Sequence, residues 1–179
     1  RALRPWVRMM LKLALSGANA RLILQNPDDA AMIEQYALAD RCSVRLIPGS
    51  GVDCQRFKPR QDARQEGRTR VLFPSRLLWD KGAAEFIDAA RILRQEGRGI
   101  EFFVAGAPDP GNPAAVPERT INDWTKQGLV QWLGHVEDMP NLLASTDIAV
   151  LPSYREGLPK SLIEAAACGL AVVTTDVPG

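Results

Sequence analysis

Y-R-E-G-L-P-K-S-L-I-E-A-A-A-C-G, which spans Tyr154–Gly169, comes after the apolar run Ile148–Leu151. Pro159 can open a helix here, because its fixed φ suits the first turn and its missing N–H is not needed there. Gly169 can close that helix in a left-handed conformation, and residues 171–175 then read as the next strand. The stretch therefore predicts a strand, a loop, a helix and a further strand in succession.

Two carboxylates belong to this unit. Glu156 is expected in the loop at the carboxyl end of a strand, and Glu164 in the first turns of the helix that follows. Open parallel α/β sheets bind their ligands at that edge. Two carboxylates that face such a crevice indicate a ligand rich in hydroxyl groups.

Other interpretations of the two acids stay open. Ser161–Glu164 has the pattern of a capping box, in which Glu164 would only bond to backbone donors at the helix start. Glu156 would then be an ordinary loop acid. The pair could also be the acid and base of a glycosidase, which depends on a separation and on pKa values that a sequence does not contain.

Strand and helix patterns alternate regularly after Val71. The expected strands are 71–74, 101–106, 130–134, 148–151 and 171–175, and the expected helices start at Lys81–Gly82, cover 118–127 and 139–144, and follow Pro159. This alternation predicts an α/β fold with a doubly wound, Rossmann-like parallel sheet.

The first fifty residues are expected to form a smaller unit. Strands over 21–25 and 43–47 flank a helix over 30–39, for which Asp28 is a suitable N-cap. The chain begins with an amphipathic helix that either contacts an anionic membrane surface or covers a sheet with its apolar face. Its basic stripe consists of Arg1, Arg4, Arg8 and Lys12.

Composition marks a boundary between the two units. From Cys54 to Arg70 the chain is polar and rich in arginine and lysine, which is typical of a linker. We therefore expect residues 1–53 to end an N-terminal domain, 54–70 to link the domains and 71–179 to form an incomplete C-terminal domain. Because the chain lacks an initial Met and stops just after a buried-type strand, we expect a fragment truncated at both ends.

Overall composition is that of a globular protein, with 179 residues, 46% of them hydrophobic, and a formal net charge of +1. This balance gives no argument for a nucleic-acid partner. Three cysteines without a C-x-x-C pair fit a reducing compartment and argue against a disulfide scaffold or a zinc site.

Ser75–Gly82, S-R-L-L-W-D-K-G, joins the first strand of the larger unit to its first helix. Arg76 and Lys81, together with the helix N-terminus, would form an anion site at the carboxyl edge of the sheet. The loop lacks G-x-x-x-x-G-K-[ST] and is not a P-loop. In the alternative interpretation the two cations are solvated and only pair with Asp80.

Gly106 and Gly134 each end a strand at the same edge, where a ligand could approach the backbone closely. His135 is the only histidine and therefore cannot supply a metal triad. Because the chain also has no D-x-D pair, metal-dependent sugar-nucleotide chemistry is not expected. His135 either lines the pocket or is simply exposed.

Four segments together resemble the retaining glycosyltransferases of family 4 (glycosyl transferases group 1), which have the two-domain GT-B fold. They are I-P-G-S-G-V-D to F-K-P (47–59), S-R-L-L-W-D-K-G (75–82), W-L-G-H-V (132–136) and D-I-A-V-L-P-S-Y-R-E-G-L-P-K-S-L-I-E-A-A-A-C-G (147–169). The last contains the family signature of two glutamates separated by seven residues. The first departs from the usual I-P-N-G-V-D by one inserted residue.

This resemblance implies a role for each candidate residue. Arg76 and Lys81 would hold the diphosphate of the donor and, with Glu156, carry the catalysis without a metal or another cofactor. Glu156 would contact hydroxyls of the donor sugar, and Glu164 those of the ribose. The other donor-binding positions would be Gly106, His135, Val136, Gly157, Leu158 and Pro159.

The same resemblance implies a hexosyltransferase-type enzyme that moves a sugar from a nucleoside diphosphate, UDP rather than GDP, to a glycan or polyprenyl-linked acceptor. Its setting would be bacterial surface polysaccharide synthesis in the cytoplasm, with peripheral contact at the inner face of the plasma membrane. Most of the acceptor domain is missing, so the chain alone is expected to be inactive. The alternatives are another GT-B enzyme (a phosphorylase or a sugar-nucleotide epimerase) and a non-catalytic module that binds nucleotide sugars.

Overall fold

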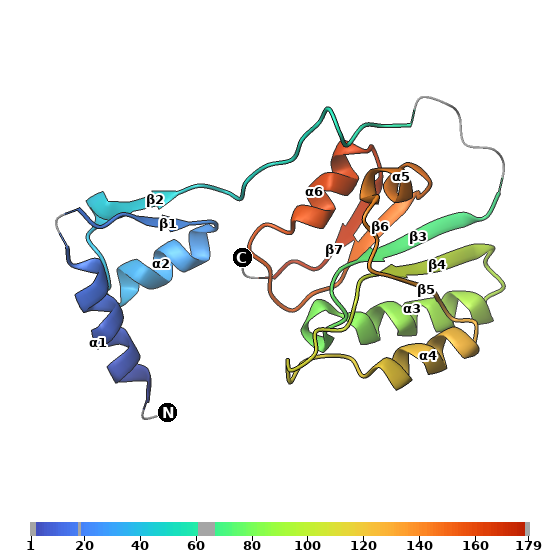
Figure 1. The fold of residues 1–179 in the computed structure, drawn as a ribbon, viewed down its shortest axis with the longest axis horizontal. Coiled ribbons are helices and arrows are strands. Elements are labelled where there is room, and N and C mark those ends of the chain that lie inside the picture. Colours follow the sequence, from blue (N-terminus) through green and yellow to red (C-terminus); the bar gives the residue numbers. More distant parts are fainter. Residues whose placement is uncertain (1–2, 18, 61–66, 178–179) are drawn as a thin grey trace. The chain divides into compact units, whose positions relative to one another are not determined.

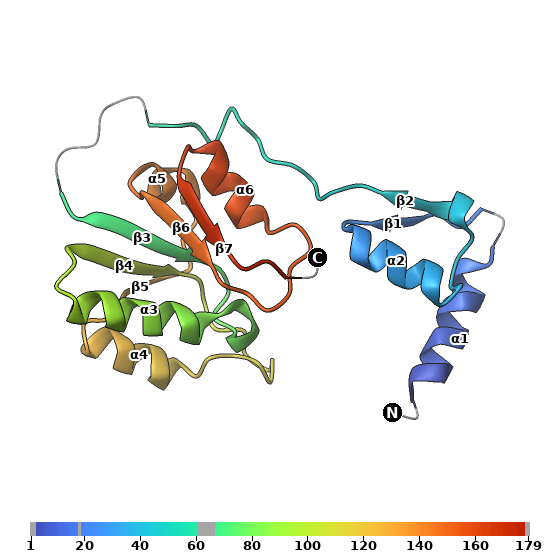
Figure 2. The same cartoon turned by 180° about the vertical axis from the view of Figure 1, so that it is seen from behind.

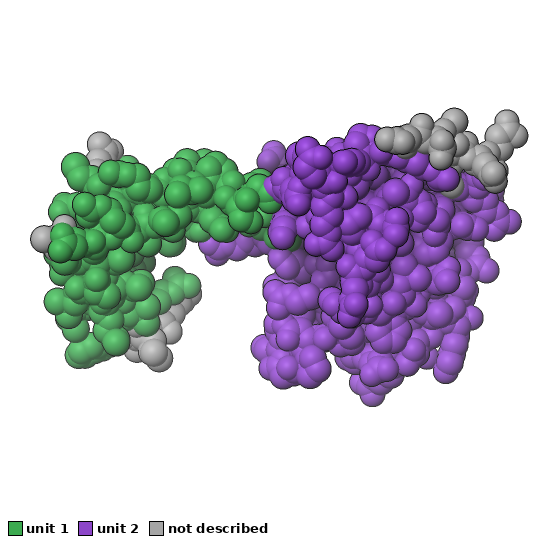
Figure 3. All heavy atoms as spheres, turned by 45° about the horizontal axis from the view of Figure 1, so that its top comes forward, with its two compact units in different colours: residues 1–51, 156–158, 178–179 green, residues 52–155, 159–177 purple. Residues whose placement is uncertain are grey.

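The structure is a computed structural model that describes residues 3–17, 19–60 and 67–177. The chain divides into two compact units, coloured separately in Figure 3. Unit 1 contains the described residues up to Gly51 and also Glu156–Leu158, whereas unit 2 contains Val52–Arg155 and Pro159–Val177.

The predicted linker, 54–70, overlaps unit 2. Phe57 is buried with the apolar core of that unit, and its first strand already begins at Thr69. Residues 61–66 of the predicted linker, like Arg1 of the predicted basic stripe, lie outside the described residues. The assignment of residues 1–53, 54–70 and 71–179 to two domains and a linker stays a prediction.

Unit 2 is built on a five-stranded parallel sheet in the order β5-β4-β3-β6-β7 (Figure 1). The chain first proceeds from β3 outward to β5 and then returns to the other side of β3 to add β6 and β7. The strand order therefore reverses between β3 and β6, which is the position where sheets of this kind bind ligands. The strands are β3 (Thr69–Pro74), β4 (Ile100–Ala105), β5 (Gln131–Gly134), β6 (Ile148–Leu151) and β7 (Ala171–Thr174).

Helices cover both faces of this sheet. Figure 1 and the reverse view in Figure 2 show α3 (Ala83–Gln95) and α4 (Glu118–Lys126) on one face. The other face carries α5 (Met139–Ala144) and α6 (Lys160–Ala167). The predicted doubly wound α/β fold is confirmed.

Apolar side chains from the sheet and its helices form the core of unit 2. Leu72 and Phe73 of the central strand are completely buried. On the α3 side, the ring centroid of Phe86 lies 5.3 Å from that of Phe73 and 5.6 Å from that of Phe102. Because β3 is covered on both faces, its sequence reads as a continuous apolar run rather than an alternating one.

Unit 1 consists of α1 (Leu3–Leu15), α2 (Pro27–Gln35), a 3-10 turn (Arg41–Ser43) and the strands β1 (Leu22–Leu24) and β2 (Val44–Leu46), which pair in parallel. The prediction that Asp28 caps the second helix is wrong. Asn26 is the N-cap, and its side chain accepts a hydrogen bond of 2.7 Å from the backbone N–H of Asp29. Pro27 suits the first helical position, so the cap falls one residue before it.

The basic stripe of α1 faces unit 1 at Arg8, whose guanidinium lies 3.6 Å from the ring centroid of Tyr36. The apolar side chains are exposed, Trp6 to 65% and Met10 to 67%. The expectation that this face covers a sheet is therefore wrong for the part of the chain that the structure describes. Among these residues no helix has the length and apolar character needed to cross a membrane.

A close approach of two loops makes Gly82 sensitive to substitution. Gly82 joins the 3-10 turn Trp79–Lys81 to α3 with a φ of +79°, and a Cβ there would lie 2.0 Å from the carbonyl oxygen of Pro152. We expect Gly82→Ala to lower the free energy of unfolding by about 2–4 kcal/mol. An alanine is strained at this positive φ, and its Cβ also forces the backbone of Pro152 to move away. Urea denaturation measures the loss.

Gly97→Ala is the matched control. Gly97 also has a positive φ, +70°, but its Cβ would meet no atom within 4 Å. Only the strain of the left-handed conformation remains, about 1 kcal/mol. Equal losses in the two variants would contradict the close approach at Gly82.

Candidate functional site

A cavity of about 460 Å³ opens at the carboxyl edge of the sheet in unit 2. Its walls are the loops after β3, β4 and β5 and the first residues of α5 and α6. It lies at the reversal of strand order, where a ligand is expected. The ionisable or hydrogen-bonding side chains in its lining are Ser75, Arg76, Asp109, His135, Ser161 and Glu164.

A larger cavity, of about 540 Å³, lies at the opposite edge of the sheet. It is lined by the amino ends of β4 and β5 and by Arg68, Arg94 and Arg98. The Arg94 guanidinium already donates to the carbonyl oxygen of Gln127 at 2.8 Å, at the end of α4. We place the candidate site in the smaller cavity, because the loops at the carboxyl ends of the strands bring groups of different chemistry together there.

Gly106 sets the spacing of two walls of this cavity. A Cβ at Gly106 would lie 1.9 Å from the carbonyl oxygen of Ser75, so only glycine lets the loops after β3 and β4 approach this closely. The indole Nε1 of Trp132 donates to the Gly106 carbonyl at 2.9 Å, and the Gly106 N–H donates to that of Gly134 at 2.8 Å. A contact with another loop therefore requires glycine at this position. The approach of a ligand to the backbone of Gly106 stays a prediction.

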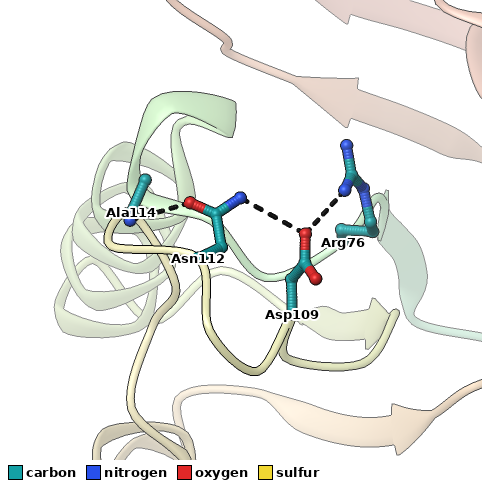
Figure 4. A network of polar contacts seen from close by, with 4 residues as sticks. All are labelled: Arg76, Asp109, Asn112 and Ala114. Carbon is teal, nitrogen blue, oxygen red and sulfur yellow. Dashed lines mark hydrogen bonds and ion pairs between the residues drawn. The ribbon is translucent and has the colours of Figure 1, made fainter.

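Arg76 extends from the loop after β3, and its side chain is 64% exposed. Its Nη1 lies 2.7 Å from a carboxylate oxygen of Asp109, in the loop after β4 (Figure 4). The alternative in which Arg76 pairs with Asp80 is therefore wrong. Sequence reasoning missed Asp109, although its place shortly after the end of a strand assigns it to the same edge.

Glu164 lies in α6 with its side chain only 14% exposed, and it lines the cavity beside Ser161. Lys160 Nζ is 3.7 Å from its carboxylate. Pro159 is the N-cap of α6 and no side chain caps the helix, so Ser161 falls at the second helical position. The capping-box interpretation of Glu164 is wrong for this reason, and so is the expectation that Pro159 is the first helical residue.

His135 and Val136 follow β5 and both line the cavity. His135 is exposed and Val136 is half-buried. No group of three or more His, Cys, Asp or Glu residues that could hold a metal ion occurs in the described ranges.

Five predicted site residues are not part of the cavity lining. Lys81 ends the 3-10 turn before α3 and is half-buried, and Pro159 caps α6. Glu156, Gly157 and Leu158 group with unit 1. The cavity therefore brings together Arg76, Gly106, His135, Val136 and Glu164 from the predicted set, with Asp109 and Ser161 in addition.

Tyr154 ties the start of the Tyr154–Gly169 stretch to the loop that carries Lys81. Its backbone N–H donates to the carbonyl oxygen of Asp80 at 2.9 Å, and its hydroxyl donates to a carboxylate oxygen of Glu85 in α3. This hydrogen bond, together with the charge of Glu85, raises the pKa of Tyr154 above its ordinary value. Two loops at the carboxyl edge are thus held together by side chain and backbone.

Comparison with known proteins assigns this fold to a class. A family model described as Glycosyl transferases group 1 matches residues 68–179. The chain superimposes on sucrose-phosphate synthase from Thermosynechococcus elongatus with a TM-score of 0.74 and 23% identity, over 96% of this chain and 44% of that one. It superimposes on HepE from Anabaena, in complex with UDP-glucose, with a TM-score of 0.73 and 22% identity, over 96% and 50%.

Curated relatives agree with this class. The chain is 30% identical over 184 residues to the N,N'-diacetylbacillosaminyl-diphospho-undecaprenol alpha-1,3-N-acetylgalactosaminyltransferase of Campylobacter jejuni. This alignment covers 97% of the chain and 46% of the relative. It is 27% identical over 180 residues to the UDP-Gal:alpha-D-GlcNAc-diphosphoundecaprenol alpha-1,3-galactosyltransferase of Escherichia coli, with 94% and 46% covered. The chain thus spans less than half the length of these relatives. It belongs to the group 1 glycosyl transferases, and unit 2 corresponds to their GT-B C-terminal domain.

Titration of Tyr154 tests the contact between the two loops. In a Tyr36→Phe background, which leaves Tyr154 as the only tyrosine, we expect the phenol to ionise above its ordinary pKa of 10.0. Because the pKa is raised, the stabilisation is present below pH 10 and is lost as the pH rises through the raised pKa. Ultraviolet absorbance of the phenolate follows the titration.

Glu85→Ala should return the pKa of Tyr154 toward its ordinary value, because it removes both the hydrogen-bond acceptor and the negative charge. Asp88→Ala is the control, since Asp88 is an exposed acid on the same helix that pairs with Arg91. An unchanged titration in Glu85→Ala would refute the contact.

Proposed function

We propose that this protein is a retaining, metal-independent glycosyltransferase that moves a hexosyl group from a nucleoside diphosphate, UDP rather than GDP, to a glycan or lipid-linked acceptor. The observation that carries the proposal is the cavity at the strand-order reversal, where Arg76 and Glu164 line the same space. A guanidinium suits a diphosphate, and a carboxylate can accept hydrogen bonds from both hydroxyls of a ribose. One ligand that carries both groups is a nucleotide sugar.

Charge stabilisation of the departing diphosphate is the chemical step that the site would promote. Negative charge develops on the bridging oxygen as the bond to the sugar breaks, and fixed cations near that oxygen lower the barrier. In our proposal Arg76 and Lys81 supply these cations and no metal or other cofactor takes part. Glu156 binds hydroxyls of the sugar, beside Gly157, Leu158 and Pro159, while Gly106, His135 and Val136 border the nucleotide.

The names of the relatives support a lipid-linked acceptor and a role in bacterial surface polysaccharide synthesis, since two of them include a diphospho-undecaprenol group. The exposed apolar side chains and the cations of α1 are suited to an anionic lipid surface. We therefore propose a cytoplasmic enzyme that is peripheral on the inner face of the plasma membrane. Because the chain spans less than half of its relatives, we further propose that it binds the donor and does not transfer the sugar alone.

Nucleotide titration tests the donor site. We expect the chain to bind UDP, and Arg76→Ala and Glu164→Ala each to weaken binding by roughly 1–3 kcal/mol, as charged hydrogen bonds are lost. Isothermal titration calorimetry with UDP, GDP and ADP measures the affinity and the preference for the base.

Arg98→Ala and Glu101→Gln are the matched controls, because they remove the same charges at the other edge of the sheet. Unchanged UDP affinity in these two variants, with losses at the cavity, is the expected pattern. A dissociation constant of about 1 mM corresponds to a binding free energy of roughly −4 kcal/mol. If the unmodified chain does not bind UDP, GDP or ADP even this weakly, the proposal loses its basis.

The Glu156→Ala variant distinguishes binding of the donor sugar from binding of the nucleotide. We expect this variant to bind free UDP like the unmodified protein and to bind a UDP-sugar more weakly, by roughly 1–3 kcal/mol. Parallel titrations with UDP, UDP-glucose and UDP-N-acetylgalactosamine provide the comparison. A loss of the same size for UDP and UDP-sugar would rule out the role assigned to Glu156.

A further inference from the structure

We propose that Asp109 is a positioning residue for Arg76, and that it holds the guanidinium in the orientation that binds the diphosphate of the donor. This inference rests on the proposed function, because it assigns Arg76 a diphosphate ligand. It adds a residue from a different loop to the candidate site. Nothing in the glutamate signature of the chain points to Asp109.

Arg76 needs such support because it is long and exposed. Its side chain is 64% accessible, and an arginine carries about 2 kcal/mol of rotamer entropy that is lost when a ligand fixes it. Asp109 contacts Nη1 at 2.7 Å and is itself only 33% exposed. A guanidinium has five N–H groups, so a contact through Nη1 leaves donors for a phosphate.

Asp109 is held in turn by Asn112. The Asn112 side-chain amide donates to the same carboxylate oxygen of Asp109 at 3.2 Å, and its carbonyl oxygen accepts from the backbone N–H of Ala114 at 2.9 Å. Figure 4 shows these groups in one chain of contacts, from the backbone of Ala114 through Asn112 and Asp109 to Arg76. The carboxylate therefore has a fixed direction before any ligand arrives.

The backbone beneath these side chains is also fixed. The Leu77 N–H donates to the carbonyl of Ala107 at 3.1 Å, and the Val116 N–H donates to that of Leu77 at 2.9 Å. The side chains of Leu77 and Val116 are buried. The loop that carries Asp109 and the loop that carries Arg76 thus form one packed structure, so the ion pair does not depend on two independently moving segments.

The direction in which UDP affinity changes when the Asp109 carboxylate is removed distinguishes a positioning role from a purely electrostatic one. A carboxylate in the wall of the cavity repels a diphosphate, so a purely electrostatic role predicts tighter UDP binding when the charge is removed. A positioning role predicts weaker binding, because Arg76 then loses its rotamer entropy when UDP binds. The two explanations therefore predict opposite changes in affinity.

UDP titration of four variants provides the test. We expect Asp109→Ala to weaken binding about tenfold and Asn112→Ala about threefold, since the first removes the support and the second only loosens it. Asp109→Asn keeps an oxygen for Arg76 Nη1 and should stay within about threefold of the unmodified protein. Glu137→Gln, an exposed acid next to Val136, is the control for charge alone and should not weaken binding.

A double-mutant cycle shows whether Asp109 acts through Arg76. In an Arg76→Ala background we expect Asp109→Ala to cause no further loss. Tighter or unchanged UDP binding in Asp109→Ala, or an equal loss with and without Arg76, would overturn the inference. Thermal unfolding of each variant checks that the protein remains folded.

The same data separate this inference from the proposed function. If Arg76→Ala loses affinity for UDP while Asp109→Ala keeps it, the donor site stands and the positioning role fails. If the unmodified protein does not bind UDP, both fail.

Discussion

Backbone contact between loops at the carboxyl edge of the sheet is the constraint on which the candidate site depends. Gly106 lies against the carbonyl of Ser75, and Gly82 against that of Pro152, at distances that leave no room for a side chain. The loop after β3 thereby contacts both the loop after β4 and the loop after β6. The side chains that these loops carry can be arranged accurately only because the backbone beneath them cannot shift.

The cavity at this edge of the sheet is lined by charges of both signs. The cavity contains the carboxylates of Asp109 and Glu164 beside the guanidinium of Arg76. A site of this composition selects a ligand by the direction of its groups more than by its total charge, because anionic and hydroxyl-bearing parts must each meet the correct partner. The donor that we propose would meet this requirement, because its ribose and its diphosphate are adjacent.

The fold could be predicted from the sequence more completely than the contacts between the loops. Short apolar runs predicted every strand of unit 2 to within two residues at each end, because a strand buried on both faces leaves a continuous local signal. Helix starts were less certain. Asn26 rather than Asp28 caps α2, since a proline fixes the first helical position, and Pro159 rather than Ser161 caps α6.

The candidate site was predicted in part, for a physical reason. Glu164 and Arg76 lie next to recognisable strand ends, so the topology of a parallel sheet places them at one edge. Asp109 contacts Arg76 across 33 residues between two irregular loops, and such a contact has no periodicity that a sequence could reveal. The grouping of Glu156 with unit 1 likewise depends on tertiary packing.

The reversal of strand order also affects how unit 2 folds. β3 can pair with β4 as soon as both have been synthesised, whereas its other neighbour, β6, lies far along the chain, with Val71 opposite Ile148. Until β6 arrives, the central strand presents one unpaired edge to its surroundings, and exposed edges of apolar strands recruit other chains. Parallel pairing over such a separation is intrinsically slow. The topology that creates the candidate cavity therefore leaves partly folded forms of this domain with an exposed strand edge, which favours aggregation.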